Sequence, residues 1–423
     1  MDEPLTILLI NFHSPQNAGD LALLQATIDQ LNNNFSKPNI IVSTNDPYRP
    51  VYSSLHVSAI PSIDYLINQS RSPTIVHKLI KFGFTLLLCA AIYLGIKPRR
   101  QPAHWQRLFD SFNSANLVVS CPGNHFLTMG RINWPLMMTS LSITLAICFH
   151  KPLYIMPQSL GPLKRGWEKH LLYHLYNYAR YVFVREKVSL ELGLRVGLSP
   201  QKIIYLPDPA FSPPVIEVEE RKTDQSLKIG VTVISGMTRS LNRALMDRYY
   251  SALADSLSIM VDKFNAKIYF FAQVVGPTAR EDDRNAIRQV MDLMAGYKDN
   301  LFANEEVLSP IELKRAYGAM DIFIASRLHS GIFSTCQYVP TLFIGYLTKT
   351  KGIIDCMAYS DWFIPIEEIT NEKMDYKLTQ IINKRPAVKK YLQDILPGLI
   401  SQTSLAGRLI AEDYNKGCQQ NRS

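Results

Sequence analysis

The sequence predicts an α/β fold in which two Rossmann-like, doubly wound domains face each other across a cleft. Three observations support this prediction. Apolar runs typical of buried strands alternate with runs of helical periodicity along the chain. At 423 residues the chain is too long for one hydrophobic core. A charged, proline-containing stretch without apolar periodicity, residues 208–226, separates two such alternating sets.

The N-terminal domain is expected to cover residues 1–212 and to begin with a continuous apolar strand, LTILLIN. A loop follows, and then a helix that starts at Asp20, whose carboxylate is well placed to cap it. One face of this helix is apolar, as packing against a sheet requires: Leu21, Leu24, Ile28 and Leu31. The later strands of this domain are predicted at IIVST, NLVVSC, PLYIMPQS, YVFVRE and KIIYLP.

The C-terminal domain is expected at residues 227–395, after a linker at residues 213–226. One helix start is clearly marked, with Ser309 as N-cap, Pro310 in the first helical position and Glu312 on the opening turn. Residues 396–423 are expected to form a C-terminal helix and a polar tail. The strands of this domain are predicted at LKIGVTVIS, AKIYFFAQV, LFAN, DIFIAS, TLFIGY and WFIPI.

The charge of the chain favours anionic partners. Lys and Arg outnumber Asp and Glu by 45 to 36, a formal net charge of +9, which suits phosphorylated metabolites, nucleotides or acidic lipid surfaces. Nucleic acid is not expected as a partner, because no Lys/Arg block is interleaved with aromatic residues. The six cysteines lack C-x-x-C spacing and the N-terminus lacks a basic signal-peptide region, so a cytoplasmic location is expected.

One apolar segment, FGFTLLLCAAIYLGI at residues 82–96, carries no charge. Basic residues flank it on both sides: Lys78 and Lys81 before it, and Lys97, Arg99 and Arg100 after it. It is shorter than the roughly 20 residues of a transmembrane helix. Two alternatives are favoured: a helix buried in the fold or at an interface, and a helix lying in the cytoplasmic leaflet with its basic flanks on anionic headgroups. A transmembrane helix is the third and least favoured alternative.

Small and polar residues follow several predicted strands, in NAGD, CPGN, PQSLGP and QVVGPT. Glycine at such places lets a ligand approach the backbone closely, although an ordinary turn and helix cap would explain any one of them. P-loop, dinucleotide-binding and G-x-S-x-G signatures are absent from the sequence, and the nine histidines show no zinc-ligand spacing, so neither a cofactor nor a metal is expected. The candidate substrate-binding residues here are Asn17, Gly19, Asp20, Gly123, Asn124, Gln158 and Gly276.

Cationic groups stand directly after strands in both halves. Arg185 follows YVFV and Arg327 follows IFIAS, positions that suit bidentate binding of a carboxylate or phosphate. His329 is the favoured acid/base residue, since an imidazole titrates near neutral pH, and Ser330 could cap the next helix. A lysine in LTKTKG, Lys349 or Lys351, could reach the same pocket. His13 and His125 also follow strands and are considered only as substrate contacts.

Six motifs, NAGD, VREK, LPDPAF, QVVGPTAREDDR, SRLHSGIF and GYLTKTKGI, resemble in this order the motif series of the polysaccharide pyruvyl transferases, over residues 7–362. The resemblance implies a glycosyltransferase-B-like architecture. It also implies transfer of a pyruvyl group from phosphoenolpyruvate onto sugar hydroxyls, which forms a pyruvate ketal and releases phosphate. The family's functional residues would correspond here to Arg185, Arg327, Leu328, His329 and Lys349.

Two departures from the family pattern concern the acceptor. Pro122 stands where a second glycine is expected, and segment 82–96 is not part of the core pattern, which hints at a lipid-linked saccharide acceptor and at peripheral contact with the inner face of the cytoplasmic membrane. Two rival functions remain. One is a nucleotide-sugar glycosyltransferase in which Arg327 and His329 hold a diphosphate. The other is a non-catalytic, membrane-associated partner in polysaccharide assembly.

Overall fold

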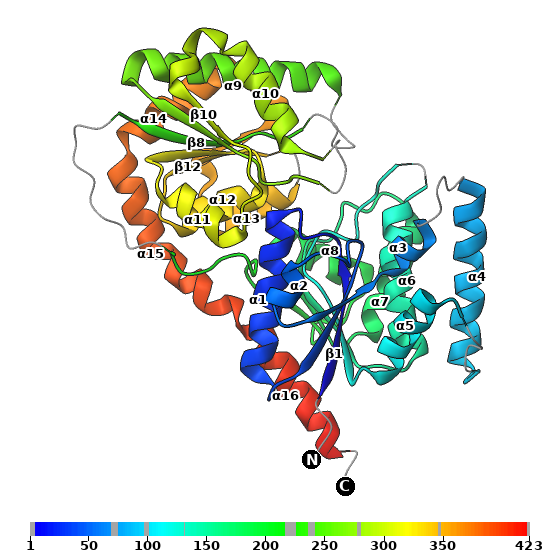
Figure 1. Ribbon diagram of the computed structural model, residues 1–423. Helices are drawn as coiled ribbons and strands as arrows, with labels where there is room; N and C mark the ends of the chain where they lie inside the picture. The colour runs from blue at the N-terminus through cyan, green and yellow to red at the C-terminus, as the bar shows by residue number, and fades with distance from the viewer. Residues whose placement is uncertain are drawn as a thin grey trace. The chain divides into compact units, whose positions relative to one another are not determined.

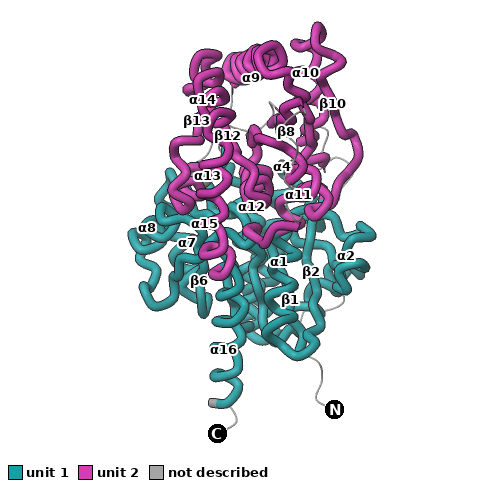
Figure 2. The backbone as a smooth tube through the Cα atoms, turned by 90° about the vertical axis from the view of Figure 1, so that its left-hand side faces the viewer, with its two compact units in different colours: residues 1–15, 23–209, 403–423 teal, residues 16–22, 210–402 magenta. Residues whose placement is uncertain are grey.

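The computed structural model describes residues 5–68, 75–96, 101–130, 132–215, 226–235, 242–276, 281–345 and 348–420. The chain divides into two compact units (Figures 1 and 2). The first unit contains Met1–Pro15, Leu23–Pro209 and Thr403–Ser423, and the second contains Gln16–Ala22 and Ala210–Gln402. A short segment close to the N-terminus therefore belongs to the second unit, and the C-terminal segment belongs to the first.

The first unit is built on a parallel sheet of seven strands. Its strand order is β3-β2-β1-β4-β5-β6-β7, so the order reverses between β1 and β4. This reversal is the place where open α/β sheets bind ligands, outside the carboxyl ends of the strands. β3, the edge strand, was not predicted from the sequence. The strands are β1 (Thr6–Phe12), β2 (Asn39–Thr44), β3 (Ser58–Pro61), β4 (Leu117–Ser120), β5 (Leu153–Gln158), β6 (Tyr181–Val184) and β7 (Ile203–Tyr205).

Helices cover both faces of this sheet, as the alternating pattern predicted. One face packs against residues of α1 (Ala18–Asn34) and α16 (Leu405–Gln420), among them Leu24, Ile28 and Ile410. The other face packs against residues of α3, α5, α6 and α7. The remaining helices of the unit are α2 (Val51–Ser54), α3 (Ile63–Asn68), α4 (Ile75–Tyr93), α5 (Ala103–Ser114), α6 (Trp134–Cys148), α7 (Gly166–Tyr178) and α8 (Lys187–Val196).

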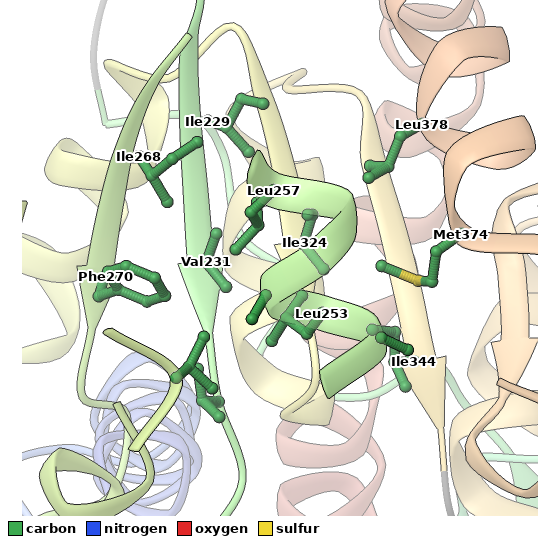
Figure 3. Packing of buried hydrophobic residues seen from close by; sticks show 14 of the residues in the cluster. Ile229, Val231, Leu253, Leu257, Ile268, Phe270, Ile324, Ile344, Met374 and Leu378 are labelled. Carbon is green, nitrogen blue, oxygen red and sulfur yellow. The ribbon is translucent and has the colours of Figure 1, made fainter. Parts of the chain in front are cut away.

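The second unit repeats this plan with a six-stranded parallel sheet of order β10-β9-β8-β11-β12-β13. Its strand order reverses between β8 and β11. α9 and α14 cover one face, where Leu253, Leu257, Met374 and Leu378 pack on apolar strand residues (Figure 3). The strands are β8 (Lys228–Thr232), β9 (Lys267–Phe271), β10 (Leu301–Asn304), β11 (Ile322–Ala325), β12 (Thr341–Gly345) and β13 (Phe363–Pro365). The α-helices are α9 (Arg243–Phe264), α10 (Asp283–Leu293), α11 (Pro310–Gly318), α12 (Leu328–Cys336), α13 (Thr348–Cys356), α14 (Asn371–Asn383) and α15 (Arg385–Thr403), with 3-10 turns at Ala295–Asn300, Ser360–Trp362 and Ile366–Glu368.

Two predicted helix starts had different outcomes. The start of α11 is confirmed: Ser309 and Glu312 form a capping box, in which the Glu312 carboxylate accepts from Ser309 N at 2.8 Å. The predicted cap of α1 is wrong. This helix begins at Ala18, and Asn17 Oδ1 accepts from Gly19 N at 3.0 Å and from Asp20 N at 3.4 Å, so Asn17 is the capping side chain. Asp20 instead lies in the first turn, where a carboxylate interacts favourably with the helix dipole.

The apolar segment at residues 82–96 forms the second half of α4 and the turn after it. Among the described helices, α4 contains a stretch, Val76–Tyr93, that is long and apolar enough to cross a membrane by length and composition. Only 17% of this stretch is buried. The alternative of a helix buried within its own unit is therefore wrong for most of its surface.

Candidate functional site

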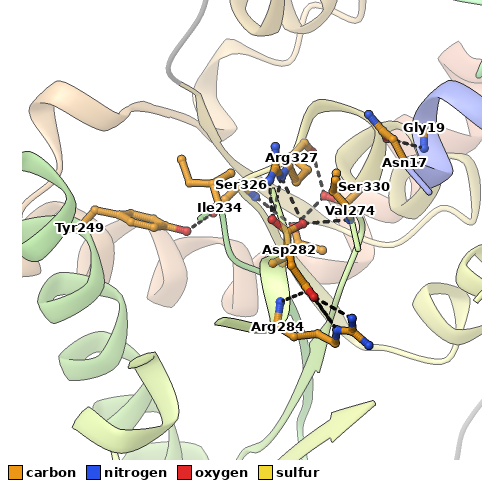
Figure 4. Close-up of polar contacts among 12 residues, drawn as sticks. Asn17, Gly19, Ile234, Tyr249, Val274, Asp282, Arg284, Ser326, Arg327 and Ser330 are labelled. Atoms are coloured by element: carbon orange, nitrogen blue, oxygen red, sulfur yellow. Dashed lines mark hydrogen bonds and ion pairs between the residues drawn. The ribbon is translucent and has the colours of Figure 1, made fainter. Parts of the chain in front are cut away.

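The loop after β11 and the start of α12 carry two of the predicted catalytic residues, Arg327 and His329, and are fixed by hydroxyl groups at the strand-order reversal of the second unit. Ser326 N donates to Thr232 Oγ1 at 3.2 Å, and Tyr249 OH donates to Ser326 Oγ at 2.7 Å. Thr232 Oγ1 and Ser330 Oγ lie 2.7 Å apart in a buried contact. This network joins β8, α9 and the start of α12 (Figure 4). The loop is consequently pre-organised by hydroxyl groups, of which only that of Ser330 belongs to a candidate residue.

Ser330 does not cap the helix after the loop, so that prediction is wrong. α12 begins at Leu328, its N-cap residue is Arg327, and no side chain makes a cap hydrogen bond there. Ser330 lies inside the first turn, where its hydroxyl donates to Arg327 O at 2.7 Å. Leu328 is buried, so its side chain belongs to the packing of the helix rather than to an open binding surface.

Arg327 is held by a carboxylate buried under it. Its Nε lies 3.2 Å from both Oδ1 and Oδ2 of Asp283, and its Nη2 also donates to Oδ1. Asp283 is fully buried, whereas 16% of the Arg327 side chain is exposed. Burial raises the pKa of Asp283, and the charge of Arg327 opposes this shift. The pair therefore fixes the direction of a cation that reaches the surface at a helix N-terminus.

Asp283 was not among the residues predicted for the site, because an acidic run such as EDDR is most simply interpreted as favouring a helix N-terminus. That interpretation holds for Asp282, the N-cap of α10, whose side chain accepts from Arg284 N at 3.0 Å (Figure 4). Asp283 instead turns inward and accepts from Val274 N at 3.0 Å. The available signal was its place within the motif QVVGPTAREDDR, although the sequence alone does not identify Arg327 as its partner.

His329 packs on the backbone of a segment from near the N-terminus. A Cβ atom built on Gly19 would lie 2.2 Å from His329 Nδ1, so only glycine fits at this position. The same segment pairs with the loop after β9: Ala18 N donates to Gln273 O at 3.1 Å and Val275 N donates to Gln16 O at 3.0 Å. The start of α1 is thereby docked beside the start of α12.

Gly276 also lies in close contact with this segment, because a Cβ there would lie 2.5 Å from Gln16 Oε1. The second unit thus brings together three separate parts of the chain that the sequence analysis had singled out. Lys349 cannot be placed in this group, because α13 includes its backbone but its side chain lies outside the described residues. Lys351 forms an exposed ion pair with Asp355 at 3.2 Å. The predicted residues that gather here are Asn17, Gly19, Asp20, Gly276, Arg327, Leu328, His329 and Ser330.

Arg185 belongs to the first unit, where it follows β6 and is 1% exposed. Its Nη1 donates to Asp208 at 2.6 Å, its Nε donates to Ser159 Oγ at 2.9 Å, and Glu186 lies 3.4 Å away. Two carboxylates of its own unit thus neutralise this guanidinium. A direct contact between Arg185 and a ligand stays a prediction, whereas the structure shows that the residue ties the ends of β5, β6 and β7 together.

His125 follows β4 at the strand-order reversal of the first unit. Its Nε2 lies 3.2 Å from Cys121 O, and a Cβ on Gly123 would lie 2.6 Å from the same nitrogen. Burial lowers the pKa of His125 to about 4, and the charges of Arg185 and His13 contribute to this lowering. The imidazole is therefore neutral at neutral pH and can act there as a hydrogen-bonding group.

The remaining candidates of the first unit lie at the same edge of its sheet. Gln158 is buried, and its Oε1 accepts from Tyr176 OH at 2.7 Å. At this edge, the buried atoms Asn124 Oδ1 and Gln158 Nε2 have no hydrogen-bond partner among the described residues. His13 Nδ1 lies 3.0 Å from Asn45 Nδ2, which donates to Asp64 at 2.9 Å. Such atoms could accept and donate hydrogen bonds to hydroxyls of a ligand.

The candidate residues thus form two groups, one at the end of each sheet. In the described ranges, no three His, Cys, Asp or Glu side chains are clustered as metal ligands would be.

Comparison with known proteins gives a family and a fold. The family model of the polysaccharide pyruvyl transferases matches residues 17–348. A curated relative, the amylovoran biosynthesis protein AmsJ of Erwinia amylovora, is 21% identical over 440 residues, covering 97% of this chain and 99% of that protein. The match to the family model includes both groups of candidate residues except His13.

Solved structures with similar folds include MnaA of S. aureus with UDP, at a TM-score of 0.57, 12% identity and coverage of 96% of this chain and 94% of that one. HepE of Anabaena in complex with UDP gives a TM-score of 0.55, 11% identity and coverage of 98% and 100%. At these identities the likeness concerns the fold alone. It confirms the predicted class of two Rossmann-like α/β domains of the glycosyltransferase-B type.

We expect Gly19→Ala to destabilise the protein, because the new methyl group would overlap the imidazole of His329. Overpacking of this kind costs roughly 1–3 kcal/mol. Urea unfolding of the full chain measures the difference. Gly417→Ala in α16 is the matched control, since a Cβ there meets nothing within 4 Å and alanine favours a helix. Equal losses in the two variants would contradict the proposed contact.

We expect His125 to make the protein less stable in acid. Its pKa is about 4 in the folded state and about 6.5 in the unfolded chain, so only the unfolded state takes up this proton between those values. Above pH 6.5 the contribution of His125 to the free energy of unfolding does not change with pH, and it is lost as the pH falls from about 6.5 to about 4. The free energy of unfolding should therefore fall less between pH 7.5 and pH 5 in His125→Gln than in the unmodified protein. Identical losses would refute this assignment.

Proposed function

The chain belongs to the polysaccharide pyruvyl transferase family and is a transferase, and we propose that it moves a pyruvyl group from phosphoenolpyruvate onto two hydroxyls of a saccharide. The product is a pyruvate ketal on a polysaccharide or its precursor, and phosphate is released. The relative's role in amylovoran biosynthesis supports a saccharide acceptor. Phosphoenolpyruvate serves as a donor substrate, and the reaction uses no further cofactor.

The observation that carries this proposal is the arrangement around the start of α12. Arg327 is aimed by Asp283, His329 lies against Gly19, and the N-termini of α1 and α12 are adjacent in the second unit. Helix N-termini and an oriented guanidinium both favour anions. Phosphoenolpyruvate carries a carboxylate and a phosphate within a few ångströms of each other, so this arrangement suits it.

The reaction requires two carbon–oxygen bonds to form and one to break. A proton is added to the methylene carbon of phosphoenolpyruvate, one sugar hydroxyl bonds to its C2, and phosphate leaves from C2 as the second hydroxyl closes the ketal. The two hydroxyl protons balance the proton gained by the methyl group and the proton on the released phosphate. We assign the proton transfer to His329, with Arg327 stabilising the negative charges. The competing role for His329 is to hold the phosphate.

The first unit is assigned to the acceptor in this proposal. Asn124 Oδ1 and Gln158 Nε2 are buried polar atoms that could bind sugar hydroxyls, and the neutral imidazole of His125 lies at the same sheet edge. Arg185 supports this region through its buried contacts with Asp208 and Ser159. Lys349 is kept as a donor-binding residue on the family resemblance.

The alternative function is transfer of a sugar from a nucleotide sugar, with Arg327 and His329 binding the diphosphate. Two of the similar structures, those of MnaA and HepE, are complexes with UDP, which is why this alternative needs a test. Titration of the full chain with phosphoenolpyruvate and, separately, with UDP distinguishes the two donors. Binding of UDP without binding of phosphoenolpyruvate would favour the glycosyltransferase.

We expect Arg327→Ala to weaken phosphoenolpyruvate binding by about 10- to 100-fold, because hydrogen bonds to charged groups contribute about 1.5–3 kcal/mol each. Isothermal titration calorimetry measures this change. Arg288→Ala is the matched control, because Arg288 is half exposed in α10 and pairs with Glu305 on the surface. The assignment fails if both variants bind phosphoenolpyruvate like the unmodified protein.

We expect His329→Gln to lower turnover by about 10²–10⁴ while leaving phosphoenolpyruvate affinity within a few-fold, as removal of a general acid predicts. Turnover is measured with carbon-13-labelled phosphoenolpyruvate and saccharide intermediates extracted from a strain that lacks this protein. Carbon NMR detects the ketal methyl group, and phosphorus NMR detects the released phosphate. A new ketal methyl signal and released phosphate should appear together. Near-normal turnover would remove His329 from the proton-transfer role, and a parallel loss of affinity would assign it to the phosphate.

A further inference from the structure

The part of the sequence that contains α4 is basic and has no acidic residue. Between Asp64 and Asp110 the sequence contains no Asp or Glu, although it contains seven Lys or Arg residues. This stretch therefore carries a formal charge of +7, out of +9 for the whole chain. The basic residues are Arg71, Lys78, Lys81, Lys97, Arg99, Arg100 and Arg107, of which Arg71, Lys97, Arg99 and Arg100 lie outside the described residues.

The outer face of α4 is apolar and exposed. Ile80 is 64% exposed, Phe84 54% and Leu87 71%, and Leu94 follows at 74% just after the helix. These positions are spaced by three, four or seven residues, so they lie on one side of the helix. Val76, Leu79, Leu86, Tyr93 and Ile96 are also exposed apolar residues of this segment. Contiguous exposed apolar surface of this kind marks an interaction site on a protein.

The inner face of α4 is fastened to the first unit. Cys89 and Ile92 are buried in the core of that unit, and Phe82 packs against Trp134 with ring centroids 6.1 Å apart. Lys81 Nζ donates to Ile67 O at 3.2 Å, and Lys78 Nζ lies 5.9 Å from the Trp134 ring centroid. Crossing a bilayer would require α4 to break these contacts. The helix is therefore suited to lie along a surface rather than to span a membrane.

We propose that α4 docks this protein onto an anionic lipid bilayer, with the helix in the plane of the interface. Ile80, Phe84 and Leu87 enter the boundary between headgroups and acyl chains, and the basic residues that flank the helix in the sequence interact with acidic headgroups. A second copy of the chain is a poorer occupant, because pairing two α4 faces would bring two acid-free, positively charged stretches together. A partner bilayer of opposite charge satisfies both the apolar face and its basic surroundings.

This inference does not depend on the proposed reaction, and vesicle binding tests it with the full chain. Phosphatidylcholine vesicles are compared with vesicles that also contain phosphatidylglycerol, in a sedimentation assay. We expect binding to the anionic vesicles to be at least about tenfold stronger and to weaken as salt screens the headgroup charge. Equal binding to both vesicle types, or binding to neither, would overturn the proposal.

The variant Ile80→Ser, Phe84→Ser, Leu87→Ser should lose at least about 90% of the binding to anionic vesicles, because it removes the inserted apolar side chains. All three residues are exposed, so the melting temperature and phosphoenolpyruvate titration should stay as in the unmodified protein. The matched control, Trp167→Ser, Val188→Ser, Leu194→Ser, replaces three exposed apolar residues of α7 and α8 and should bind vesicles normally.

A second variant tests the charge separately. Replacing Lys97, Arg99 and Arg100 with Gln should reduce the preference for anionic vesicles and its salt dependence. Sedimentation equilibrium without lipid measures whether the chain forms a dimer, which is the alternative to membrane docking. A dimer that the α4 serine variant abolishes, together with no vesicle binding, would show that a second copy covers α4 and would overturn the proposal.

Discussion

The site in the second unit depends on one buried ion pair, Arg327 with Asp283. Asp283 is sealed from solvent, where an unpaired carboxylate would be costly, so the guanidinium above it has little freedom to turn away. The backbone N–H of Val274 binds the same carboxylate and links the pair to the end of β9. Buried pairs of this kind add little net stability, whereas several parallel hydrogen bonds between a guanidinium and a carboxylate add geometric specificity. Asp283 therefore fixes the orientation of the Arg327 guanidinium before any ligand binds.

Each unit contains a pair of an arginine and a buried aspartate, but the two pairs have different roles. In the first unit, Arg185 also follows a strand and also meets a buried aspartate, Asp208. However, Arg185 is itself buried and bound on several sides, whereas Arg327 keeps part of its side chain at the surface. An arginine after a strand can thus be either an internal tie or a surface cation. The surrounding carboxylates and hydroxyls decide which of these it becomes.

The sequence predicted the sheets well because both faces of a parallel sheet are buried, which leaves continuous apolar runs such as IFIA in β11. It missed β3, a short edge strand with the sequence SAIP that lacks such a run. It identified Arg327, His329 and Gly19 as candidates from their places after strands. It could not show that Gly19 lies against His329 or that Asp283 holds Arg327, since these contacts join segments that only the fold brings together.

The segment Gln16–Ala22 has a consequence for how this protein can vary. In the sequence it lies between two parts of the first unit, but in the structure it belongs to the second unit, where Gly19 lies against the imidazole of His329. A chimera that joined the N-terminal half of one relative to the C-terminal half of another would therefore inherit a hybrid site, with the imidazole from one parent and its glycine from the other. Such a chimera would keep the site only if the residues that the two parents supply still pack as Gly19 and His329 do here.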